Sequence, residues 1–193
     1  MRRFSIQLSR ELPAAFGIFL ALLFAPAAVS GPAYIRVSGR ALPDVELVDQ
    51  HGQKRRFCSD VIQNKIAVVN TVFTNCTTIC PLMGSNFAAL RKMLGPAGDG
   101  RIGLVSISLD PEVDTPARLD AWSQKFGETR DWTLLTGSKA DIDLLLKSLQ
   151  LFTAEKLAHQ PVVLVGGAGV ESWATMPAFG PAQTSAYLHK RMH

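Results

Sequence analysis

The sequence predicts an α/β domain built around one sheet, with helices on both faces and a hairpin at its N-terminal end. Two observations lead to this prediction. Strand patterns and helix patterns alternate through residues 66–149, which is the order that produces parallel strands joined by crossover helices. The chain then closes with a strand, a glycine-rich turn, a second short strand and a final helix, all within residues 161–192.

The first half of the domain is predicted from three patterns. Residues 45–57 are typical of a short hairpin with its turn at His51. Residues 66–73 form an unbroken, largely β-branched run, the pattern of a central strand buried on both faces. From Pro81 onward apolar residues recur at helical intervals, and the run ends at Gly95. We therefore expect a strand that leads directly into a helix.

The second half continues the alternation. Thr115 and Pro116 open a helix that runs to about residue 126, because proline suits the first helical position. Further strands are predicted at residues 102–108, 132–136, 161–165 and 170–175, and further helices at residues 139–149 and 183–192. This order is typical of a thioredoxin-like sheet.

The first thirty residues have the composition of an export segment. Arg2, Arg3 and Arg10 precede an apolar run at residues 13–29 that ends in small residues. The length of the run fits both a signal that is cleaved after it and an uncleaved membrane anchor, because about 17 residues is near the shortest span that crosses a bilayer. We expect residues 1–30 to be a signal peptide or anchor, residues 31–43 an irregular linker, and residues 44–193 a domain outside the cytoplasm.

The charge of the chain argues against a nucleic-acid partner. The full chain of 193 residues carries a formal net charge of +4. Removing residues 1–30, which hold three arginines and one glutamate, leaves +2. So small an excess, with no long basic stripe, does not fit a nucleic-acid-binding protein.

Cys76 and Cys80 lie where the predicted strand meets the helix. Residues four apart face the same way on a helical turn, so both sulfurs can converge on one point. The positive helix end and its free N–H groups favour thiolate over thiol. Such a pair can close into a disulfide, exchange electrons with another dithiol, or hold a soft metal ion such as copper(I). The spacing alone leaves these alternatives open.

A metal held by two thiolates needs a further ligand, and His159 is the candidate. It precedes the strand at residues 161–165, and in a thioredoxin-like sheet the loop entering that strand lies beside the cysteine turn. An exposed loop position is the alternative for this histidine. The remaining histidines are expected to be exposed: His51, His189 and His193. Cys58, the third cysteine, is expected to be a partly buried, inert thiol.

Four segments of the chain resemble the SCO/SenC family in order and spacing. They are VFTNCTTICP at residues 72–81, SISLDPEVDTP at residues 106–116, LLTGS at residues 134–138, and His159. The resemblance extends over about residues 43–175, and the two longer motifs together are more specific than either alone. The chain departs from many members at Thr77, Thr78 and Ala158, where they have proline, aspartate and aspartate.

The resemblance implies a thioredoxin-like protein that faces the periplasm or the intermembrane space and binds one copper through Cys76, Cys80 and His159. It also implies that the protein delivers copper to, or reduces the cysteines of, the copper site of cytochrome c oxidase. Asp110 and Asp114 match the family as well, and we expect them to cap a helix and order a loop. The missing aspartate before the histidine removes a hydrogen-bond partner that would orient it.

These observations favour an exported copper metallochaperone with an oxidase subunit as its client. The alternative is a thiol–disulfide reductase, regenerated by a reducing thioredoxin-like partner, in which one cysteine attacks a client disulfide and the other resolves it. A third interpretation is a permanent structural disulfide between Cys76 and Cys80. Thioredoxin-like proteins carry a cis-proline near the position of Pro161, so we also expect a cis peptide bond between Gln160 and Pro161.

Overall fold

The computed structural model of the protein describes residues 31–98, 100–127 and 131–192. The predicted export segment, residues 1–30, and His193 lie outside the described residues. Among the helices that are described, none combines the length and the hydropathy needed to cross a membrane.

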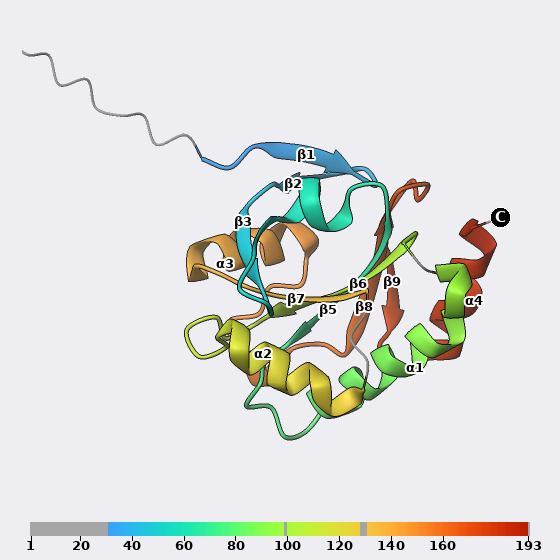
Figure 1. Cartoon of the computed structure of the whole chain (residues 1–193). Helices are drawn as coiled ribbons and strands as arrows, with labels where there is room; N and C mark the ends of the chain where they lie inside the picture. The colour runs from blue at the N-terminus through green and yellow to red at the C-terminus, as the bar shows by residue number, and fades with distance from the viewer. Residues whose placement is uncertain (1–30, 99, 128–130, 193) are drawn as a thin grey trace, which may run out of the picture. The chain divides into compact units, whose positions relative to one another are not determined.

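The centre of the fold is a seven-stranded mixed sheet in the order β4-β3-β7-β6-β5-β8-β9 (Figure 1). Its three middle strands run parallel: β5 (Ile66–Val72), β6 (Ile102–Ser108) and β7 (Trp132–Thr136). Every residue of β5 and β6 is buried, as expected for apolar strands with both faces covered. The predicted strands at residues 66–73, 102–108 and 132–136 are confirmed.

Antiparallel strands extend the sheet on both sides. β3 (Glu46–Asp49) pairs with β7 and with β4 (Lys54–Arg56), which confirms the predicted hairpin. β8 (Val162–Gly167) pairs with β5, and β9 (Ala174–Pro177) pairs with β8. The last strand begins at Ala174, later than predicted, because Val165 of β8 pairs with Ala174, while Gly166 and Gly167 pair only with β5.

Helices cover both faces of the sheet, as predicted (Figure 1). The four α-helices are α1 (Cys80–Gly98), α2 (Pro116–Ser123), α3 (Lys139–Leu149) and α4 (Pro181–Met192), and the short helical turns are η1 (Phe57–Ile62), η2 (Gln124–Phe126) and η3 (Lys156–Ala158). α1, α2 and α4 share an apolar cluster with Val68 and Val72, whereas α3 and η1 share another with Ala67 and Val69. Alternate side chains of β5 thus serve two cores.

A second hairpin replaces the irregular linker predicted for residues 31–43. β1 (Tyr34–Val37) and β2 (Arg40–Pro43) pair antiparallel across a turn at Ser38 and Gly39, whose φ values are 47° and 78°. Two positive-φ residues match the tight turn that hairpins prefer. The linker prediction is wrong because it gave this turn signal no weight, and the compact unit begins at Pro32.

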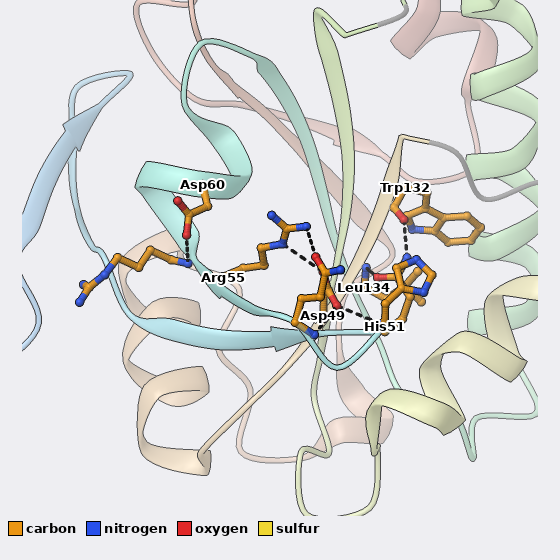
Figure 2. Close-up of polar contacts among 9 residues, drawn as sticks. Asp49, His51, Arg55, Asp60, Trp132 and Leu134 are labelled. Atoms are coloured by element: carbon orange, nitrogen blue, oxygen red, sulfur yellow. Dashed lines mark hydrogen bonds and ion pairs between the residues drawn. The ribbon is translucent and has the colours of Figure 1, made fainter.

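Buried polar side chains fasten the β3–β4 turn to β7 (Figure 2). The carboxylate of Asp49 accepts hydrogen bonds from two backbone N–H groups of the turn and from Arg55 Nε. Gln50 donates through Nε2 to the carbonyl of Trp132 over 2.8 Å and accepts from the N–H of Leu134 over 2.9 Å. These bonds fix the end of the sheet where β7 begins.

Candidate metal centre

The cysteine pair is placed by the junction between β5 and α1. β5 ends at Val72, and the carbonyl of Phe73 accepts a hydrogen bond from the N–H of Cys76 over 3.1 Å, which turns the chain sharply. Cys80 is the first residue of α1. Both thiols are free and both side chains are buried, with 6% of Cys76 and none of Cys80 exposed. The strand therefore places the cysteine pair at the end of the sheet where the parallel strands have their C-terminal ends.

Cys76 is the more acidic thiol. Burial by itself would raise its pKa, but hydrogen bonds from the thiol and backbone N–H of Cys80, and from the backbone and hydroxyl of Thr78, outweigh burial and lower the pKa of Cys76 to about 7. The Cys80 N–H lies 3.3 Å from the Cys76 sulfur, and the Thr78 hydroxyl lies 3.7 Å from it. These donors stabilise a thiolate at the helix N-terminus.

Cys80 behaves in the opposite way. Burial, and then the hydrogen bond that its thiol gives to Cys76, raise the pKa of Cys80 to about 12. The pKa of Cys80 therefore lies well above that of Cys76. One thiolate is available near neutral pH, and the second is formed when a metal ion or a chemical step removes the proton.

His159 lies beside the cysteines, as predicted. It follows η3, stands three residues before the start of β8 at Val162, and is 7% exposed. Its Nε2 is 3.7 Å from the Cys80 sulfur, and its Nδ1 is 3.4 Å from the Thr71 hydroxyl on the other side of the ring. Burial lowers the pKa of His159, with a backbone hydrogen bond at Gln160 opposing in part. The ring is thus held neutral, which is the form that binds metals.

The peptide bond before Pro161 is not cis, so that prediction is wrong: the described residues contain no cis peptide bond. A trans bond suits the local hydrogen bonds. The N–H of Val162 donates to the carbonyl of Gln160 over 2.9 Å, and the carbonyl of Pro161 accepts from Ala178 over 2.8 Å. This turn brings His159 to the site without an isomerised proline.

The three side chains form a compact ligand set. The sulfurs of Cys76 and Cys80 and a ring nitrogen of His159 all lie within 4.8 Å of one another. Ligand atoms placed about 2.0–2.3 Å from one ion in a plane are about 3.8–4.0 Å apart, taking zinc bond lengths as the guide. The observed cluster therefore needs only a small contraction to enclose an ion, and two thiolates with one imidazole suit a soft metal.

A buried carboxylate orders the loop before the cysteines. Asp114 is fully buried and accepts hydrogen bonds from the N–H of Thr74 (3.0 Å), the hydroxyl of Thr74 (2.6 Å) and the hydroxyl of Ser108 (2.6 Å). Its loop-ordering role is confirmed. The predicted capping role for the aspartates is wrong, because Thr115 is the N-cap of α2 and accepts from the N–H of Arg118.

The other candidate ligands lie elsewhere. His51 is exposed in the β3–β4 turn, beside the start of β7 and therefore at the sheet end opposite the cysteines. His189 is half-buried in α4, and not exposed as predicted. Cys58 is only 3% exposed and packs in the apolar cluster of α3 and η1. Among the described residues, Cys76, Cys80 and His159 are the cluster suited to a metal ion.

Sequence reasoning missed three neighbours of the ligands. Thr71 faces the far nitrogen of His159, the ring of Phe73 lies edge-on to the imidazole with centroids 6.0 Å apart, and Lys156 forms an ion pair with Asp110. Because the run at residues 66–73 is predicted to be buried on both faces, the sequence could have placed Thr71 in the interior. Nothing in the sequence pattern pairs the lysine with the aspartate, since the two are 46 residues apart.

The fold and the site together define a thioredoxin-like protein with a two-cysteine, one-histidine centre at the start of its first long helix. Comparison with known families narrows this class. Residues 38–166 match the SCO1/SenC family model, and the chain belongs to that family.

Individual relatives agree with this assignment. A SCO1 protein homolog of Bacillus subtilis is 30% identical over 105 residues, which cover 53% of this chain and 54% of the relative. The chain thus spans about half the length of that relative. A SCO1/SenC family lipoprotein of Bacillus anthracis has a crystal structure that matches with a TM-score of 0.68 and 25% identity, over 83% of this chain and 100% of that chain. ScoI of Bradyrhizobium japonicum, solved with copper bound, matches with a TM-score of 0.63 and 20% identity, over 76% and 96% of the two chains.

Proposed function

We propose that this protein is an exported copper carrier. It binds one Cu(I) ion through Cys76, Cys80 and His159 and passes the ion to a client protein that builds a copper site, with cytochrome c oxidase as the client. The observation that carries this proposal is the meeting of two buried sulfurs and one ring nitrogen within 4.8 Å. The family of the chain and the copper-bound ScoI structure support the choice of metal.

The arrangement of the ligands suits a carrier. Binding requires the pair to be reduced and the proton of Cys80 to be displaced by the ion, since burial and the bond to Cys76 raise the pKa of Cys80 to about 12. His159 needs no deprotonation, because burial lowers its pKa. Transfer proceeds when ligands of the client replace these three in turn, so that copper stays bound at every stage.

The location that fits this function lies outside the cytoplasm, in the periplasm. Residues 1–30 have the composition of an export segment, which releases or anchors the domain according to whether it is cleaved.

A thiol–disulfide reductase is the second candidate, and the difference between the cysteine pKa values favours it. The Cys76 thiolate would attack a client disulfide, forming a mixed disulfide and releasing one client thiolate. The Cys80 sulfur would then displace the second client thiolate, leaving a Cys76–Cys80 disulfide. Two electrons pass to the client, and a reducing thioredoxin-like partner restores the pair. The two functions are compatible, because copper loading also needs a reduced pair.

Anaerobic titration of the reduced protein with Cu(I), in competition with a chromophoric chelator, tests the carrier. We expect the wild-type protein to take one equivalent of Cu(I) from the chelator, and the Cys76→Ser, Cys80→Ser double variant to take none. His51→Ala is the control, since this histidine is exposed at the other end of the sheet. Binding that is absent in the wild type, or unchanged in the double variant, overturns the proposal.

A further inference from the structure

We propose that Lys156 is a positioning residue that latches the His159 loop onto the cysteine pair and so sets the rate at which copper leaves. The inference rests on the proposed copper function. Lys156 is the first residue of η3 and stands three residues before His159. Its ammonium group pairs with the carboxylate of Asp110, which lies in the loop between β6 and α2.

The Lys156–Asp110 pair differs from an ordinary surface ion pair. The Asp110 side chain is only 11% exposed, whereas that of Lys156 is 44% exposed. The lysine ammonium also lies 5.7 Å from the centre of the Phe73 ring, within the range of a cation–π contact. One side chain from the histidine loop therefore contacts both of the other segments that build the site.

Asp110 is itself held in place. Its N–H donates to the hydroxyl of Ser108 over 2.9 Å, and its carbonyl accepts from the N–H of Asp114 over 2.8 Å. Asp114 in turn binds Thr74, two residues before Cys76. A continuous set of polar contacts thus runs from Lys156 to the cysteine loop, and the latch closes against a rigid support.

Besides the ion pair of Lys156, the loop that carries His159 is held at the imidazole by Thr71 and Phe73 and near its start by Lys147, which lies over the ring of Phe152. Within residues 151–160 the histidine is the one buried residue, and Leu157 on η3 is 77% exposed. A cavity of about 180 Å³ lies on the side of the imidazole away from the cysteines, lined in part by Thr71, Phe152 and Ala158. The ring has room to withdraw there when the ion pair opens.

These contacts have a chemical consequence. While the Lys156–Asp110 ion pair is formed, which is the closed state of the latch, His159 stays within reach of the two sulfurs and a bound ion is enclosed. With the latch open, the loop carries the imidazole away, leaves copper on two sulfurs, and uncovers the side from which a client ligand approaches. Lys156 thus acts through His159 and does not touch the ion.

The test compares copper dissociation from four proteins: wild type, Lys156→Met, Asp110→Asn and the double variant. Methionine keeps the length of the side chain and removes its charge. We expect Cu(I) to transfer to a chelator about tenfold faster from each single variant than from wild type, in line with the effect of groups that orient metal ligands. The double variant should be no faster than either single variant, because both changes break the same ion pair. Lys156→Arg should restore the wild-type rate. Lys139→Met, which breaks the exposed ion pair with Asp143 on α3, should leave the rate unchanged.

The same change made in a His159→Ala background separates positioning from general destabilisation. If Lys156 acts through the histidine, Lys156→Met has no further effect on dissociation there. A wild-type rate in Lys156→Met, or an undiminished tenfold effect without His159, overturns the proposal.

If the wild-type protein binds no copper, the carrier function is overturned, but the role of Lys156 in holding the loop can still be tested by a second measurement on the metal-free protein. Diethyl pyrocarbonate modifies accessible histidines, and His159 is 7% exposed with the latch closed. We expect modification of His159 in the metal-free protein to be about tenfold faster in Lys156→Met, and unchanged in Lys139→Met. Equal rates in wild type and Lys156→Met would show that the ion pair does not hold the loop.

Discussion

The backbone N–H of Cys80 points at the sulfur of Cys76 and donates a hydrogen bond to it over 3.3 Å. The first residue of α1 therefore contributes to the site twice, through its own thiol and through the peptide group that stabilises its partner. The burial of Cys80 and the hydrogen bond between the two thiols account for most of the difference in acidity between the cysteines, and the N–H of Cys80 adds to it.

Alkylation of the reduced protein reads this difference directly. Only the thiolate reacts with iodoacetamide, so we expect the rate at Cys76 to rise with pH and to reach half its maximum near pH 7, the pKa given by its hydrogen bonds. Cys80, whose pKa burial raises to about 12, should stay unmodified at pH 9. Peptide mass spectrometry after timed labelling measures both. A midpoint for Cys76 at the ordinary cysteine value of about 8.5 would contradict the geometry.

Two neighbouring threonines provide the matched control. Both threonines are exposed, but Thr78 places its hydroxyl 3.7 Å from the Cys76 sulfur, whereas Thr77 forms no such contact in the described structure. Thr78→Ala should raise the midpoint by about 0.5 pH unit, because a hydrogen bond is worth about 0.5–1.5 kcal/mol and one pKa unit about 1.4 kcal/mol. Thr77→Ala should leave the midpoint in place.

Asp114 should be the costliest of the loop residues to replace. Asp114→Asn turns one buried acceptor into a donor that faces other donors, Thr74 and Ser108. We expect the free energy of unfolding in urea to fall by about 2–4 kcal/mol. Asp120→Asn on α2, where the carboxylate accepts one exposed bond from Gln124, should cost less than about 0.5 kcal/mol. Similar losses in both variants would mean that the buried network adds nothing.

Much of the fold could be predicted because the signals were local. The run at residues 66–73 is largely β-branched and buried on both faces, and the start of α2 carries Thr115 and Pro116, so strand and helix followed from neighbouring residues. The hairpin at Tyr34–Pro43 was missed although its signal is local, because the turn at Ser38 and Gly39 was given no weight. The pairing of Lys156 with Asp110 was missed for a different reason: long-range ion pairs leave no periodic pattern.

Cys58 should have no part in copper binding. Burial, and then the charge of Asp44, raise the pKa of Cys58 to about 12, and its sulfur lies 3.9 Å and 3.8 Å from the carbonyls of Leu42 and Pro43 in the other apolar cluster. Cys58→Ser should therefore leave the affinity for Cu(I) within about twofold of wild type and cost about 1 kcal/mol of stability. Competition titration and urea unfolding check the two values. A large loss of affinity with the fold intact would show that a third sulfur takes part.

Removing the imidazole should weaken copper binding without disturbing the cysteine couple. His159→Ala is expected to lower the affinity for Cu(I) by about 100-fold or more, at least as much as the loss of a group that only orients a ligand. The equilibrium of Cys76 and Cys80 with glutathione should change by less than about twofold, because neither cysteine loses a strong hydrogen bond. If glutathione equilibrium shifts strongly while copper affinity stays the same, the reductase becomes the better description.

X-ray absorption spectroscopy of the Cu(I)-loaded protein tests the central claim most directly, because it counts the atoms bound to the ion. We predict two sulfur ligands and one imidazole nitrogen in the wild type and in Cys58→Ser, and two sulfurs with no imidazole in His159→Ala. A first shell of sulfur alone in the wild type, or an imidazole signal that survives in His159→Ala, would contradict the three-ligand centre of Cys76, Cys80 and His159.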